Sequence, residues 1–99
     1  MKVSILPSAM EDLEDGFRFY EQQVTGLGSY FLETLFSDID SLKLYAGTHQ
    51  QVFGYYRLLS KRFPYAVYYS FVAETVKVNA VLDCRRDPDW ILERLGKHD

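Results

Sequence analysis

The sequence predicts an α+β fold in which two helices precede an antiparallel sheet of three or four strands and a short helix follows it. Apolar residues recur at helical spacing through the first half of the 99-residue chain. Stretches rich in Val, Tyr and Phe, separated by short turns, fill the second half. An Asp-Pro pair near the end is typical of a helix start. A sheet with its helices on one face accommodates all of these elements.

The helical half follows a short predicted strand, "KVSIL", which stops at Pro7. Ser8 and Glu11 have the spacing of a capping box and predict a helix start at Ser8. The apolar stripe of this helix comprises Ala9, Leu13, Phe17, Tyr20 and Val24. The segment "TGLG" interrupts the pattern, and a second helical pattern runs from about residue 29 to residue 45. The two helices are therefore expected to form a helical hairpin.

The sheet half contains three predicted strands, "VFGYYRLL", "FPYAVYYSFVA" and "TVKVNAVL", which would form a meander. Side chains alternate between the two faces of a strand. One face of the last strand is therefore expected to carry Val76, Val78, Ala80, Leu82 and Cys84. The other, open face would carry Lys77, Asn79, Val81, Asp83 and Arg85. A final helix is expected to start at Asp87-Pro88, to pack through Trp90, Ile91 and Leu95, and to end at Gly96.

The composition is typical of one folded domain, which we assign to residues 1–99: 47% of the residues are hydrophobic and 25% are charged. The net charge is −3, but residues 1–50 carry three basic and eight acidic residues, whereas residues 51–99 carry eight and six. Overall acidity argues against a protein that coats nucleic acid by charge alone. The asymmetry indicates two surfaces with different roles.

No metal, cofactor or membrane partner is expected. The single cysteine, Cys84, excludes an internal disulfide and zinc sites that need several thiolates. His49 and His98 are far apart and lack metal-ligand spacing. The chain has no phosphate-binding or dinucleotide-binding glycine loop. Its longest strongly apolar run, residues 63–73, is shorter than the ~20 residues that span a bilayer. The N-terminus does not resemble a signal peptide, so a cytoplasmic location is expected.

The segment "VLDCRRDPDW" places two adjacent arginines where the last strand ends. If the strand continues through them, Arg86 points to the helix-packed face, where a carboxylate of the acidic helical half could meet it. Arg85 then points to the open face beside Asp83. A purely structural role is the simpler alternative, because several aspartates lie close enough in sequence to pair with both arginines.

Basic residues dominate the sheet half. Between residues 57 and 86 two acidic residues accompany six basic ones: Arg57, Lys61, Arg62, Lys77, Arg85 and Arg86. Tyrosines are interleaved with them. Guanidinium groups bind phosphate in a bidentate manner and tyrosine rings stack on bases, so RNA or another polyanion is one candidate ligand. The alternative is that most of these tyrosines pack in the core.

Three segments, in this order, resemble the RelE/ParE superfamily of toxins from type II toxin–antitoxin (plasmid stabilisation) modules: "AMEDLEDGFRFYEQQVTGLGSYF", "YYRLLSKRFPYAVYYSF" and "VNAVLDCRRDPDWILER". The resemblance covers nearly the whole chain. It implies a compact domain whose concave sheet face is the working surface and whose toxicity is masked by a cognate antitoxin. One branch resembles ribosome-dependent, metal-independent endoribonucleases that cleave mRNA (mRNA interferases), and the other resembles poisons of DNA gyrase.

The resemblance also implies roles for particular residues. In a nuclease, Arg57 and Arg85 would stabilise the charge that grows on the scissile phosphate. Asp83 stands where many members have a histidine, and it could act as the base only if neighbouring cations do not hold its pKa too low. The remaining cations would contact nucleic acid or another target: Lys61, Arg62, Lys77 and Arg86.

We therefore expect a toxin that acts through gyrase poisoning or ribosome-dependent mRNA cleavage. The missing histidine slightly favours the ParE-like side, and the acidic net charge would slow the encounter with ribosomal RNA. The alternative is a degenerate, non-toxic member that acts only as a protein-interaction module. Whether the chain forms a homodimer is left open.

Overall fold

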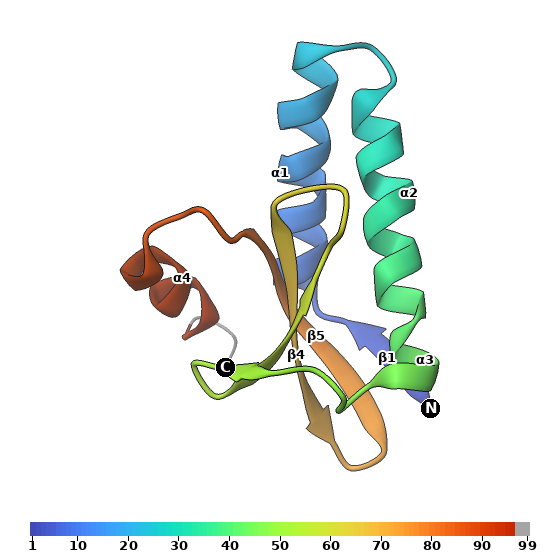
Figure 1. The fold of residues 1–99 in the computed structure, drawn as a ribbon, viewed down its shortest axis with the longest axis vertical. Helices are drawn as coiled ribbons and strands as arrows, with labels where there is room; N and C mark the ends of the chain where they lie inside the picture. Colours follow the sequence, from blue (N-terminus) through green and yellow to red (C-terminus); the bar gives the residue numbers. More distant parts are fainter. Residues whose placement is uncertain (97–99) are drawn as a thin grey trace.

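The computed structural model describes residues 1–96, so the expectation about His98 lies outside the described residues. The elements follow the order β1 (Lys2–Ile5), α1 (Pro7–Gln23), α2 (Leu27–Asp40), α3 (Leu42–Tyr45), β2 (Gln51–Val52), β3 (Tyr55–Leu59), β4 (Tyr65–Val72), β5 (Thr75–Asp83) and α4 (Pro88–Leu95). Figure 1 shows the α1–α2 hairpin and α4 on opposite sides of β4 and β5. The predicted α+β class is confirmed, but the expectation that all helices cover one face was wrong.

The sheet has five strands in the order β1-β5-β4-β3-β2. It is mixed rather than purely antiparallel, because β1 pairs with β5 in the parallel direction. The segment "VFGYYRLL" is also not one strand. Phe53 and Gly54 have φ angles of 58° and 83°, and this pair of positive angles forms a tight two-residue turn between β2 and β3.

The first helix starts two residues earlier than the predicted capping box implies, because that box makes Ser8 the N-cap. Its N-cap is Leu6, which makes no side-chain cap, and Pro7 occupies the first helical position. The Ser8 hydroxyl instead donates a hydrogen bond to the backbone carbonyl of Asn79 in β5 (3.4 Å). The capping-box prediction was therefore wrong, and Ser8 connects α1 to the sheet.

The turn between α1 and α2 uses the glycines that the sequence placed there. Gly26 adopts a left-handed conformation with φ of 90°. The Glu21 carboxylate accepts hydrogen bonds from the backbone N–H groups of Gly26 and Gly28, each at 2.9 Å. A Cβ atom at Gly28 would lie 2.6 Å from the carbonyl oxygen of Phe17, so only glycine permits this close approach of the two helices.

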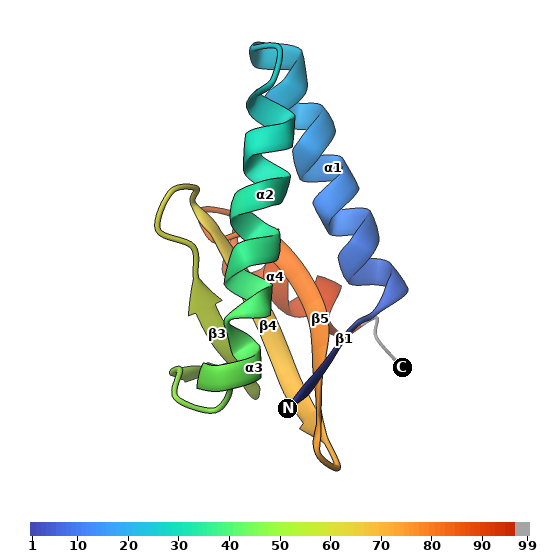
Figure 2. The same ribbon diagram turned by 90° about the vertical axis from the view of Figure 1, so that its right-hand side faces the viewer.

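Each face of the sheet has its own apolar core. On the α1–α2 side, the ring of Phe31 lies about 5 Å from the rings of Tyr20, Phe63 and Tyr65. On the other side, Ile91 and Leu95 of α4 pack against four residues of β4 and β5: Ala66, Tyr68, Ala80 and Leu82. Figure 2 shows α4 behind the two central strands when α2 is in front.

A β-bulge decides which β5 side chains belong to which core. Tyr68 pairs with Ala80 and Tyr69 pairs with Val78, so one step along β4 corresponds to two along β5, and Asn79 is the additional residue. Beyond the bulge, Val81 joins the α1–α2 core, whereas Ala80 and Leu82 join the α4 core. The predicted alternation was therefore wrong from Ala80 onward, and the bulge places Asp83 on the helix side, away from Lys77.

Candidate functional site

The cations predicted to form one binding surface lie on two faces. Arg57 pairs across strands with Tyr68, and Lys77 pairs with Ser70, all on the face that α4 partly covers. Asp83 pairs with Tyr65, whose ring packs on Phe31 in the opposite core. The expectation that Lys77 shares the open face with Asp83 and Arg85 was therefore wrong, because the bulge separates them, and Arg57 lies on the same face as Lys77.

Arg57 and Tyr68 form a polar pair on the α4-facing side of the sheet. Burial raises the pKa of the Tyr68 phenol, and the positive charge of Arg57 opposes this only partly. The phenol therefore remains protonated at neutral pH and can donate a proton rather than accept one. The Nε atom of Arg57 is buried and has no hydrogen-bond partner within residues 1–96. We define Arg57, Tyr68, Ser70 and Lys77 as the Arg57 face.

Asp83 is fully engaged by its neighbour Arg85. The Nε and Nη2 groups of Arg85 donate to the two carboxylate oxygens at 3.1 and 2.8 Å, and its backbone N–H donates to Oδ1 at 2.9 Å. These hydrogen bonds lower the pKa of Asp83. A carboxylate held ionised in this way is a poor general base, so the condition that the sequence set for Asp83 is not met.

Lys61 and Arg62 lie in the turn between β3 and β4 and adjoin the helical hairpin. Arg62 donates a hydrogen bond from Nη1 to the Tyr30 hydroxyl (2.7 Å), and its guanidinium carbon lies 5.9 Å from the centroid of the Tyr30 ring. The charge of Lys61 acts on Asp38 of α2, where burial nevertheless raises the pKa of the carboxyl. Neither cation contributes to the Arg57 face.

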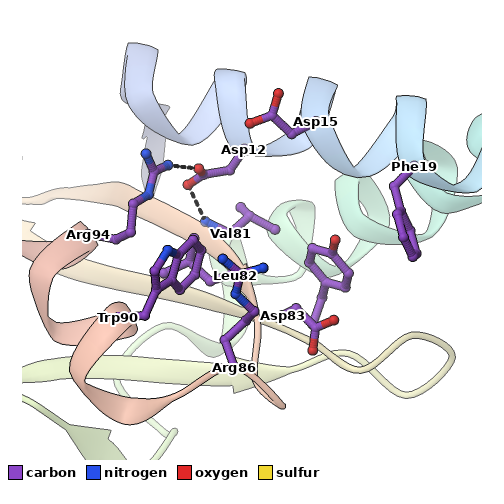
Figure 3. A pocket seen from close by; sticks show the side chains of 10 residues that line it. Asp12, Asp15, Phe19, Val81, Leu82, Asp83, Arg86, Trp90 and Arg94 are labelled. Carbon is purple, nitrogen blue, oxygen red and sulfur yellow. Dashed lines mark hydrogen bonds and ion pairs between the residues drawn. The ribbon is translucent and has the colours of Figure 1, made fainter.

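A hollow of about 330 Å³ lies between α1 and α4 at the end of β5, and we call it the α1–α4 groove (Figure 3). It opens where β1 stops: β1 pairs with β5 only as far as Val78, and no strand within residues 1–96 covers the β5 edge beyond it. Residues that line the groove include Asp12 and Phe19 of α1, Tyr65 and Asp83 of the sheet, and Arg86 and Trp90 after it. Burial raises the pKa of Tyr65 to about 12, so this wall carries a neutral phenol.

Asp12 closes part of the uncovered edge of β5. Its side chain is buried, its Oδ2 accepts a hydrogen bond from the backbone N–H of Val81 (3.0 Å), and its Oδ1 pairs with Arg94 of α4. The carboxylate thus occupies the position that a carbonyl of a neighbouring strand would take. Asp12 and Arg94 were missed in the sequence. A signal existed, because Asp12 falls between Ala9 and Leu13 on the buried face of α1.

Arg86 stacks on an aromatic ring instead of meeting a helical carboxylate. Its guanidinium carbon lies 3.9 Å from the centroid of the Trp90 ring, and Figure 3 shows the two side chains next to each other in the groove. The expected partnership between a basic residue and a carboxylate of α1 exists, but Arg94 makes it. Asp87 caps α4 as predicted, because its Oδ1 accepts from the Asp89 N–H at 2.8 Å.

A second hollow of about 640 Å³ lies between β1 and α2, with Val3, Ile5, Phe36 and Ile39 among its lining residues. β1 is an edge strand. The Leu6 N–H donates a hydrogen bond to the Val78 carbonyl of β5. Because the backbone groups of successive residues in a strand point to opposite edges, the N–H and C=O groups of Val3 and Ile5 point away from β5. This surface therefore combines an unpaired strand edge with apolar side chains.

Residues 1–96 contain neither a membrane-spanning helix nor a cluster of metal-ligating side chains. No helix there is long and apolar enough to cross a bilayer. No group of three or more His, Cys, Asp or Glu side chains within the same residues could hold a metal ion.

Known proteins resemble this chain in structure rather than in sequence. No protein-family model matches the sequence, and no curated protein matches it. A chain of the solved structure described as "Chromosomal ParDE TA system from P. aeruginosa" superposes with a TM-score of 0.71 at 15% sequence identity. The match covers 82% of this chain and 92% of the other. The fold that the RelE/ParE resemblance predicts is therefore the fold of this protein.

Proposed function

We propose that this protein is the toxin of a toxin–antitoxin pair, that it arrests growth by binding its target, and that a cognate antitoxin neutralises it. The observation that carries the proposal is the similarity of its fold to a chain of the ParDE toxin–antitoxin system over 82% of its length. The three sequence segments that resemble the RelE/ParE superfamily support the same function independently of the structural comparison.

A binding mechanism, such as gyrase poisoning, has more support than RNA hydrolysis. A nuclease needs a base close to the cations that stabilise the phosphate. Asp83 lies on the face opposite Arg57, and Arg85 occupies its carboxylate. The Tyr68 phenol beside Arg57 is protonated and could serve only as an acid.

Ribosome-dependent mRNA cleavage is the second candidate, and the Arg57–Tyr68 pair is the specific observation that favours it. The guanidinium of Arg57 would stabilise a phosphate in the transition state, and the phenol would protonate the leaving oxygen. The Tyr68 side chain is 1% exposed and packs under α4, so this mechanism requires α4 to move away from the sheet. In both mechanisms the Arg57 face is the working surface, with Lys77 as an additional cation.

The β1 edge is the surface that we assign to the antitoxin. An extended segment could add to β1 through the outward backbone groups of Val3 and Ile5, while its side chains enter the hollow against Phe36 and Ile39. Binding at β1 alone would leave the Arg57 face exposed. Other residues of the antitoxin would therefore have to cover that face.

Growth after tightly controlled induction, in a host without the antitoxin, tests the function. We expect wild type and Arg18→Ala to arrest growth, because Arg18 lies on the exposed side of α1 and its ion pair among the described residues is with the exposed Asp15. Arg57→Ala should relieve the arrest while its circular dichroism remains that of wild type. Induction of the DNA-damage response would identify gyrase, and new mRNA 5′ ends would identify cleavage. Normal growth with abundant folded wild type would contradict the proposal and favour the non-toxic interaction module.

A further inference from the structure

We propose that the α1–α4 groove binds an extended, mostly apolar segment of the antitoxin that carries one carboxylate, with Arg86 as the cation that receives it. The inference rests on the proposed function only in naming the antitoxin as the source of the segment. It concerns a site that shares no lining residue with the hollow at β1 and that is separate from the Arg57 face.

The charges around the groove leave one cation without a carboxylate partner. Each acidic residue of the lining has its own arginine: Asp12 pairs with Arg94, Asp15 with Arg18, and Asp83 with Arg85. Arg86 also lines the groove, and no ion pair of Arg86 is found within residues 1–96. Its charge reaches Asp83 more weakly than that of Arg85 does. Arg86 is therefore available to pair with one carboxylate of a ligand.

The stacking of Arg86 prepares it to receive a carboxylate. Trp90 covers one flat face of the guanidinium at 3.9 Å, which restricts its orientation while its N–H groups remain in the ring plane. Arginine binds a carboxylate through two such N–H groups, and a guanidinium that is already oriented loses less entropy on binding.

The rest of the groove is suited to an extended peptide. Phe19 at its rim is 51% exposed, so an apolar ring is available for contact with a ligand. The Cys84 N–H donates a hydrogen bond to the carbonyl of Pro64, just before β4. Because successive N–H groups of a strand point to opposite edges, the Asp83 N–H points to the uncovered edge of β5. An unpaired strand edge beside an exposed aromatic ring is a surface to which an extended segment can add.

The same lining disfavours a polyphosphate or a nucleic acid strand. Three carboxylates, those of Asp12, Asp15 and Asp83, line the groove together with the two arginines Arg86 and Arg94. These carboxylates would repel a ligand with several negative charges more strongly than a ligand with one, and Arg86 is the lining cation that no carboxylate within residues 1–96 pairs with.

Tryptophan fluorescence can report on the groove directly, because Trp90 is the only tryptophan of the chain. The probe is the blocked peptide acetyl-Val-Glu-Phe-Val-amide, compared with acetyl-Val-Gln-Phe-Val-amide, which lacks the charge. We expect the Glu peptide to change the Trp90 emission saturably and to bind about tenfold more tightly, a difference of about 1.4 kcal/mol.

Variants of two stacked arginines provide the matched comparison. Arg86→Gln should weaken the Glu peptide about tenfold and leave the Gln peptide unchanged, because only the charged contact is lost. Arg62→Gln removes an arginine that also lies over an aromatic ring, Tyr30, but outside the groove, and should change neither affinity. Equal binding of the two peptides, or a Trp90 signal that does not respond to either, would overturn the proposal.

The protein encoded beside the gene then tests the source of the segment. If wild type arrests growth and Arg86→Gln weakens the purified toxin–antitoxin complex about tenfold, both proposals stand. If growth arrest occurs but the complex is unaffected by Arg86→Gln, the groove inference fails and the toxin function remains. If the peptides bind as expected without growth arrest, the toxin function fails and the peptide site remains.

Discussion

Two aspartate–arginine pairs flank the α1–α4 groove, and they differ in almost every respect except composition. Asp12 and Arg94 are 82 residues apart in sequence, and the Asp12 side chain is 3% exposed. Asp83 and Arg85 are two residues apart, and the Arg85 side chain is 65% exposed. The first pair connects α1 to α4, whereas the second closes a turn onto itself.

The difference teaches that the structural value of an ion pair depends on burial and on what the pair connects. A buried carboxylate that loses its partner remains as an uncompensated charge, which costs several kcal/mol, whereas an exposed pair is already solvated in both states. Asp12 also satisfies the Val81 N–H at an edge that no strand covers. The Asp12 pair therefore supports the tertiary structure, and the Asp83 pair mainly orients Arg85.

The largest expected effect comes from removing the buried carboxylate. Asp12→Ala leaves the Val81 N–H without an acceptor and the Arg94 charge without a partner, so we expect a loss of about 3–5 kcal/mol in the free energy of unfolding. Urea denaturation followed by circular dichroism measures it. Asp12→Asn, which keeps an oxygen for the Val81 N–H, should cost less. A cost for Asp12→Ala below about 1 kcal/mol would contradict the role of the buried pair.

A double-mutant cycle sharpens the comparison next. The Asp12→Asn and Arg94→Gln changes, alone and together, should give a coupling energy of about 1–3 kcal/mol, since each single change strands the other group. The matched cycle with Asp83→Asn and Arg85→Gln should give a clearly smaller coupling, because Arg85 is solvent-exposed. Equal couplings in the two cycles would mean that burial does not distinguish the pairs.

A smaller effect is expected for Asp83 alone, and it should depend on pH and salt. The pKa of Asp83 is lower in the folded than in the unfolded chain, so its contribution is present above the unfolded pKa of about 3.9 and is lost as pH falls through the folded value. In about 1 M NaCl, where the Debye length is ~3 Å, the Asp83→Asn effect at neutral pH should shrink, because salt screens part of the attraction to the exposed Arg85. Undiminished destabilisation at high salt would show that Asp83 acts through something other than Arg85.

The smallest effect is expected at a neutral contact far from both pairs. The Tyr69 hydroxyl accepts from the Gly47 N–H (2.9 Å) and lies 2.5 Å from Nδ1 of His49, to which it can donate. Burial lowers the pKa of His49, so the unfolded chain binds the proton more readily and stability should fall as pH drops below about 6.5. Comparing urea midpoints of wild type and His49→Gln from about pH 8 to about pH 5.5 isolates this term. A pH dependence that His49→Gln leaves intact would assign it to other groups.

Local sequence patterns predicted the elements that depend on near neighbours. The helical hairpin around "TGLG", the Asp87 cap with Pro88 at the first helical position, and the strand-rich second half are all present. These features follow from hydrogen bonds and backbone preferences within a few residues. The turn at Phe53 and Gly54 between β2 and β3 is equally local. A positive φ is rare for Phe, however, so the sequence pattern predicted one continuous strand there.

The candidate site could not be predicted to the same extent, because strand register is a property of pairs of strands. The additional residue at Asn79 is visible only when β5 is aligned with β4, and it reverses the faces of the residues that follow. Sequence alternation alone therefore grouped Asp83 with Lys77. Arg94 likewise meets Asp12 only because α4 folds back across the end of β5.

The sequence by itself determined the α+β class, the helix ends marked by glycine and proline, and an excess of positive charge in the sheet half. Tertiary structure alone decided which cations share a face, which carboxylate is buried, and that Arg86 is left with Trp90 as its neighbour. The physical reason is range: periodicity and capping act over one or two helical turns, whereas register, burial and ion pairing depend on residues brought together from distant parts of the chain.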